Sequence, residues 1–148
     1  MTCYSIRRCR GVGLLEVLIS VLVLSIGLLG AAALQTQALK TSADAQYFQR
    51  ATLLANDYLE RARANRNALA TYALNKQQPG CSITNPGGTT AERDKALWLQ
   101  QLGCQLPDAS AEVRIQDQQI QILITWFDRA ASSDKTTRSK QFQISSQL

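Results

Sequence analysis

An unbroken apolar segment near the start of the chain, residues 12–34, sets the first limit on the fold. Its only clearly polar side chains, glycines aside, belong to Glu16, Ser20 and Ser25. A helix rises about 1.5 Å per residue, so a helical run of this length can cross a bilayer. The segment therefore predicts a membrane-spanning helix, and the acid near its start calls for an explanation.

Positive charge is concentrated just before this segment. The net charge is +5, and Arg7, Arg8 and Arg10 supply three of the positive charges. Without residues 1–11 the balance is 13 basic to 11 acidic side chains, an excess too small to argue for nucleic acid. Basic residues before an apolar run predict that the N-terminus stays cytoplasmic and that the remainder faces the periplasm.

The composition argues against a catalytic or metal-binding function. It contains no histidine, which is the commonest general base and metal ligand, and no recognisable nucleophile arrangement. We therefore expect no catalytic residue, metal or cofactor, and a membrane-anchored enzyme is a poor hypothesis. A cleaved secretory signal fits poorly too, because such signals have apolar cores of about 7–15 residues, whereas the helical pattern here continues.

The helical pattern becomes amphipathic after the apolar segment. From residue 35 to about 75, apolar side chains recur mostly at intervals of three or four residues (Phe48, Ala51, Leu54, Tyr58, Ala62, Leu69 and Tyr72). We predict one helix from about Gly13 to Leu74. Residues 12–34 would form its half in the membrane or a filament core, and residues 35–75 its half against a head domain.

Residues 76–148 predict that head. Glycine and proline mark a loop over 76–90, and a short helix follows over 91–102, with Thr90 as N-cap and Gly103 as its end. Alternating apolar residues predict three strands, at 112–116, 119–127 and 140–148. Asp117–Gln118 is a tight hairpin candidate, and 130–137 a polar turn. The expected fold class is α+β, with a long N-terminal helix packed on a small antiparallel sheet.

The four cysteines fall into two pairs. Cys3 and Cys9 lie in the basic leader, whereas Cys81 and Cys104 flank the loop and short helix of the head. If the leader is removed, an even pair remains, as a disulfide in an oxidising compartment requires. The alternative is two unrelated thiols.

Glu16 is the residue that points to function. An acid at the middle of a lipid-spanning helix is unfavourable by about 3 kcal/mol, and less near the end. The positive end of the helix dipole offsets only about 0.3–1 kcal/mol of this. A cut after Gly11 would give Val12 a free α-amine, and Glu16 could pair with such an amine on a neighbouring subunit.

The basic leader, Gly11-Val12, Glu16 and the apolar run together resemble the class III prepilin signal of type IV pilins. The resemblance implies cleavage between Gly11 and Val12 by prepilin peptidase, N-methylation of Val12, and a role for Glu16 in subunit entry into the filament. Phenylalanine and threonine are usual in the family at the positions that Val12 and Gly13 occupy here.

Residues 14–19, 25–30, 34–35 and 58–66 are also similar to the pilus-modification (PilV) group of minor pilins. This resemblance covers about half of the chain. It implies a minor pilin that helps initiate pilus assembly near the tip, in support of twitching motility and attachment. The implied partners are other minor pilins, the major pilin, prepilin peptidase, the inner-membrane assembly platform and a tip adhesin; the implied location is the inner membrane and then the pilus fibre.

Several alternatives stay open. Arg61, Arg63 and Arg66 are either a solvated face or candidate contacts to another minor pilin. A type II secretion pseudopilin would share the leader, helix and sheet. A DNA-uptake minor pilin would need a basic patch on the head, where the only obvious cluster is Lys135, Arg138 and Lys140.

Overall fold

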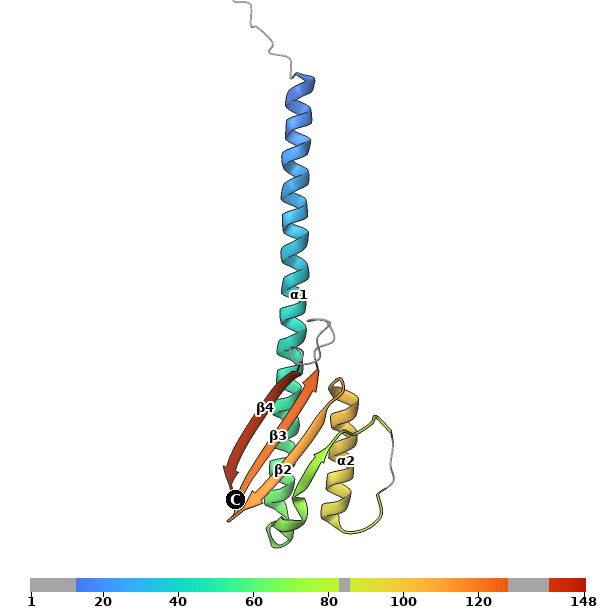
Figure 1. Ribbon diagram of the computed structural model, residues 1–148, viewed down its shortest axis with the longest axis vertical. Helices are drawn as coiled ribbons and strands as arrows, with labels where there is room; N and C mark the ends of the chain where they lie inside the picture. Colours follow the sequence, from blue (N-terminus) through green and yellow to red (C-terminus); the bar gives the residue numbers. More distant parts are fainter. Residues whose placement is uncertain (1–12, 83–85, 128–138) are drawn as a thin grey trace, which may run out of the picture. The chain divides into compact units, whose positions relative to one another are not determined.

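The computed structural model describes residues 13–82, 86–127 and 139–148. The leader, Gly11, Val12 and the turn predicted over 130–137 lie outside the described residues. The elements in chain order are helix α1 (Leu14–Ala64), 3-10 helix η1 (Arg66–Tyr72), strand β1 (Leu74–Gln77), helix α2 (Thr90–Gln105) and strands β2 (Ser110–Gln116), β3 (Gln119–Phe127) and β4 (Ser139–Gln147) (Figure 1).

The chain divides into two compact units, one up to Lys40 and the other from Thr41 to Leu148. In the first unit, α1 is exposed at every described residue. The hydroxyls of Ser20, Ser25 and Thr36 donate hydrogen bonds to the carbonyls four residues earlier. These few polar side chains are thus satisfied within the helix, as an apolar environment requires. The helix is long and apolar enough to cross a membrane.

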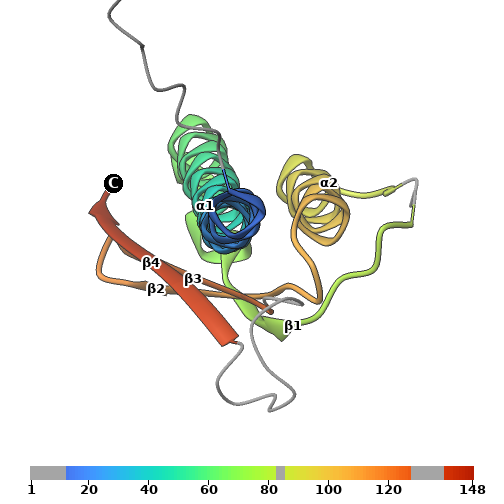
Figure 2. The same ribbon diagram turned by 90° about the horizontal axis from the view of Figure 1, so that it is seen from above.

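The second unit is the head, a four-stranded antiparallel sheet in the order β1-β2-β3-β4. The later part of α1 and helix α2 both cover one face of this sheet (Figure 2). The α+β prediction is therefore confirmed, but the prediction of three strands is wrong. The strand that was missed, β1, has four residues of which only Leu74 is buried, so the sequence shows no alternation there.

The core forms where the two helices meet the sheet. The predicted inward face of β3 is confirmed, because Ile120, Ile122, Ile124 and Trp126 are all buried. Trp98 of α2 is fully buried, and its indole N–H donates to the carbonyl of Leu54 at 2.8 Å. This bond satisfies the one polar atom of Trp98 and fixes α2 against α1.

The long helix ends ten residues earlier than predicted, at Ala64 instead of Leu74. Asn65 leaves helical geometry with φ −126° and ψ 50°, and η1 then carries the chain to β1. Leu69 and Tyr72 still follow the helical spacing because a 3-10 turn nearly preserves it. Periodicity alone therefore could not locate the break.

Helix α2 begins and ends differently from its prediction. Thr89, and not Thr90, is the N-cap, and it forms a capping box with Glu92 in which each accepts a hydrogen bond from the other's backbone. The helix continues through Gly103 to Gln105. A Cβ at Gly103 would lie 2.8 Å from the backbone of Pro79 and Gly80, so this glycine permits close packing of a loop and does not end the helix.

The predicted hairpin between β2 and β3 is confirmed. Gln116 pairs with Gln119, and Asp117 and Gln118 form the turn with φ angles of 47° and 64°. Positive φ at both central residues is the backbone that the right-handed twist of a two-residue hairpin requires. Asp tolerates this conformation better than most residues.

Candidate functional site

Glu16 lies in the first turn of α1, where its backbone N–H donates to the carbonyl of Gly13 at 2.9 Å. Within the part of the chain that the structure describes, its carboxylate makes no ion pair. The positive end of the helix supplies its local compensation. Its carboxylate is therefore available for a cationic group from outside this chain, and the two residues at the predicted cleavage site, Gly11 and Val12, lie outside the described residues.

The three candidate contact arginines differ in their surroundings. Arg61 donates to Asp57 at 2.9 Å and to Asp94 of α2 at 3.3 Å. Arg63 donates to Glu60 at 2.6 Å and to Ser146 of β4 at 2.8 Å. Two of the arginines thus hold the head's own elements together.

Arg66 differs from the other two. It is exposed at the start of η1 and makes no ion pair with the described residues. The structure therefore leaves Arg66 as the candidate contact whose charge is not used within the head.

A buried tyrosine pair that sequence reasoning missed fixes the end of α1. The Tyr58 hydroxyl donates to the carbonyl of Tyr72 at 2.6 Å, and the Tyr72 hydroxyl donates to Asp94 at 2.6 Å. Burial raises the pKa of the Tyr58 hydroxyl, and the nearby Tyr72 and Asp94 raise it further. The pair therefore stays protonated and joins α1, η1 and α2. Fourteen residues separate the tyrosines, so their spacing gave no local signal.

The structure joins Cys81 and Cys104 by a disulfide that spans 23 residues of sequence. The bond attaches the loop after β1 to the last turn of α2. Its Cα atoms are 4.5 Å apart, and the missing side chain of neighbouring Gly103 allows the loop to come this close. The disulfide and Gly103 thus both hold the loop after β1 close to the end of α2.

The described residues include no evident metal site. Over residues 13–82, 86–127 and 139–148, no cluster of three or more His, Cys, Asp or Glu side chains has a metal-binding arrangement. Trp98 and Trp126 are both core residues.

Two family models match the chain. The prokaryotic N-terminal methylation motif matches residues 6–32, and the family described as type IV pilin Tt1218 matches residues 33–101. No curated protein and no solved structure gives a significant match. The first match begins in the basic leader and includes Glu16, and the second runs from α1 through η1 and β1 into α2.

The fold, a long N-terminal helix whose later part packs on an antiparallel sheet, agrees with the type IV pilin match, and the methylation motif overlaps the first part of that helix. Residues 33–101 are thus similar to a type IV pilin domain of the Tt1218 type, and residues 6–32 match the N-terminal methylation motif of a class III prepilin signal. Motif and domain together support a structural pilin subunit that assembles with other pilins after processing by prepilin peptidase. The apolar helix fits anchoring in a membrane before the subunit joins a pilus.

Proposed function

We propose that this chain is a minor pilin that helps to initiate assembly of a type IV pilus near the tip. In this proposal, residues 1–11 are a leader removed between Gly11 and Val12, and Val12 is then N-methylated. Residues 12–34 cross the inner membrane with the N-terminus cytoplasmic, and both the amphipathic stretch over 35–75, which packs within the head, and residues 76–148 are periplasmic. The pili would serve twitching motility and attachment.

Glu16 is the observation that carries this proposal. It is an acid in the first turn of α1, at the start of a long apolar and exposed stretch of that helix, and no described residue of its own chain forms an ion pair with it. A carboxylate inside a membrane or filament is unfavourable by itself, and a cationic partner lowers that cost. The α-amine of a processed neighbouring subunit is such a partner, and the matched methylation motif supplies the processing signal.

The minor-pilin role rests on the resemblance of residues 14–19, 25–30, 34–35 and 58–66 to the pilus-modification group, and 58–66 is the stretch at the end of the long helix. In the structure this stretch holds Arg61 and Arg63, which bond within the head, and Arg66, which is exposed. A fixed frame with one exposed cation suits a specific contact to another minor pilin. The major pilin, the assembly platform and a tip adhesin would be further partners.

The test compares a deletion strain carrying the wild-type chain with one carrying Glu16→Val. We expect deletion to reduce surface pili, counted by electron microscopy, and the Glu16→Val chain to reach the membrane without restoring them. Asp44→Val is the matched control, because Asp44 is an acid on the same helix beyond the apolar run and forms no ion pair with the described residues.

Two outcomes would redirect the proposal. Deletion that blocks type II protein secretion and leaves pili intact would identify a pseudopilin instead. Normal piliation with the Glu16→Val chain would remove the main support for the pairing role. The mass of the N-terminal peptide would test cleavage independently, because a start at Val12, one methyl heavier, is expected.

A further inference from the structure

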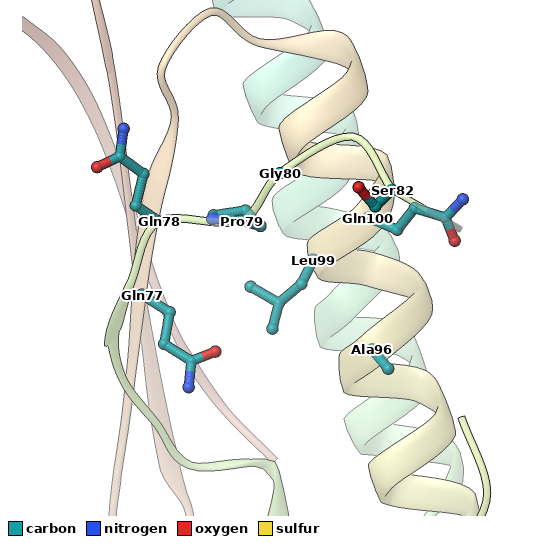
Figure 3. Close-up of a pocket in the computed structure, with 8 residues that line it drawn as sticks. All are labelled: Gln77, Gln78, Pro79, Gly80, Ser82, Ala96, Leu99 and Gln100. Atoms are coloured by element: carbon teal, nitrogen blue, oxygen red, sulfur yellow. The ribbon is translucent and has the colours of Figure 1, made fainter. Parts of the chain in front are cut away.

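A pocket opens between the end of β1, the loop that follows it and helix α2 (Figure 3). Its volume is about 420 Å³, within the range of known ligand sites. The side chain of Leu99 points from α2 toward the strand and loop. The lining residues come from the strand and loop (Gln77, Gln78, Pro79, Gly80 and Ser82) and from the helix (Ala96, Leu99 and Gln100).

The lining selects for an uncharged occupant. None of these eight side chains carries a charge, and Ala96, Leu99 and Pro79 provide an aliphatic surface. The glutamine amides at its rim each offer donors and an acceptor, which match the N–H and C=O groups of a peptide. Among the described residues, no aromatic side chain lines the pocket, so these residues offer no stacking surface of the kind on which sugar rings commonly rest.

The pocket also borders a free edge of the sheet. Gln77 is the last residue of β1, and β1 is an outer strand that pairs only with β2. Within the described residues, no backbone hydrogen bond joins β1 to a second strand. An extended peptide could therefore bond along this edge and place one aliphatic side chain in the pocket, which is a common mode of peptide recognition.

The charge on this strand disfavours a second copy of the chain as occupant. Two β1 edges paired in a register that sets Lys76 opposite Lys76 would bring two ammonium groups together, and like charges directly opposite each other are destabilising. A different chain has no such conflict. Exposed lysine on an edge strand is a common protection against self-association.

The disulfide holds one wall of the pocket. Cys81 lies between the lining residues Gly80 and Ser82, and its partner Cys104 is in α2, which provides the opposite wall. Reduction would free the loop from the helix. The pocket should therefore persist only in the oxidised chain.

From these observations we propose that the pocket docks an extended, uncharged peptide segment of a different pilin subunit. The segment adds to the free edge of β1 and seats an aliphatic side chain on Leu99, and the Cys81–Cys104 bond is required. This inference rests on the proposed function, and it names where on the head a partner subunit binds.

The test is photo-crosslinking of the full chain in its own cells. A photoreactive amino acid replaces Gln100, which lines the pocket, or Gln101, which is its exposed neighbour on α2 outside the lining. We expect an adduct to another pilin subunit from position 100 and none from position 101. A second variant, Ala96→Glu, places a charge on the aliphatic surface and should reduce the adduct roughly tenfold or more.

The results separate this inference from the proposed function. An adduct only to a non-pilin protein or to a second copy, equal adducts from both positions, or an adduct insensitive to Ala96→Glu would overturn the docking proposal. So would an adduct that survives replacement of both cysteines by serine. Pili counted in the same strains test the function itself, because loss of pili on deletion can persist while the docking proposal fails.

Discussion

Reduction of the Cys81–Cys104 bond should lower the free energy of unfolding of the head by about 3.4 kcal/mol. The figure follows from the 23-residue separation of the cysteines in the chain-entropy relation, in which a cross-link restricts the unfolded chain. The head has 108 residues from Thr41 to Leu148, a size at which 1 kcal/mol shifts the melting temperature by about 4 °C. We therefore expect a decrease of roughly 14 °C.

The measurement is thermal unfolding of the full chain in detergent, with and without reductant, monitored by far-ultraviolet circular dichroism. The control is the double variant Cys81→Ser/Cys104→Ser, which should melt at the lower temperature and should not respond to reductant. Equal melting temperatures for the oxidised and reduced wild-type chain would refute the reasoning. That result would mean that the packing of Gly103 alone holds the loop on α2.

Three further changes test individual contacts of the head by the same unfolding measurement. Gly103→Ala places a Cβ 2.8 Å from loop backbone and should destabilise by about 1–3 kcal/mol, whereas Gly87→Ala, with nothing within 4 Å, should change stability little. Hydrogen bonds from the backbone and side chain of Thr89, the α2 N-cap, lower the pKa of Glu92. The ionised carboxylate therefore stabilises the fold above the unfolded-state pKa, and this contribution is lost as the pH falls. The difference in stability between the wild-type chain and Glu92→Gln should accordingly vanish in acid. Tyr58→Phe removes the hydroxyl that donates to the Tyr72 carbonyl and should destabilise by about 1–3 kcal/mol. Because the pKa of Tyr58 is raised, the wild-type chain should also lose stability as the pH rises above about 10, and this alkaline loss should be smaller in the variant.

The parts of the fold that local pattern determines could be predicted from the sequence. Alternation over residues 119–127 placed Ile120, Ile122, Ile124 and Trp126 on one buried face, and the hairpin at Asp117 followed from the polar pair between two such runs. The acid within an apolar run also singled out Glu16 from the sequence, and its pairing role stays a prediction. In each case the physical signal lies within a few residues of the feature that it predicts.

The parts that failed depend on contacts between distant residues. The end of α1 at Ala64 is stabilised by the Tyr58–Tyr72 bond, and no glycine or proline marks it. The three-residue spacing of Thr89 and Glu92 is typical of a capping box, whereas the sequence prediction names the neighbouring Thr90 as the N-cap. A glycine in a helical pattern predicts a helix end, and Gly103 shows no other local signal. Its real role, to let the loop at Pro79 and Gly80 approach the helix, depends on a distant segment that leaves no trace in the local sequence.

The same distant contacts change how the arginine stretch should be tested. Arg61 and Arg63 bond to Asp94 and Ser146 of other elements, whereas Arg66 is exposed. Loss of Arg61 should lower the stability of the head by about 1 kcal/mol, because the pair is partly exposed, so any loss of pili could follow from weaker folding. Arg66→Ala should leave the unfolding curve unchanged. If it still reduces pilus number, its charge acts on another subunit; if pili are normal, the arginine stretch serves the fold of the head and the contact to a minor pilin lies elsewhere.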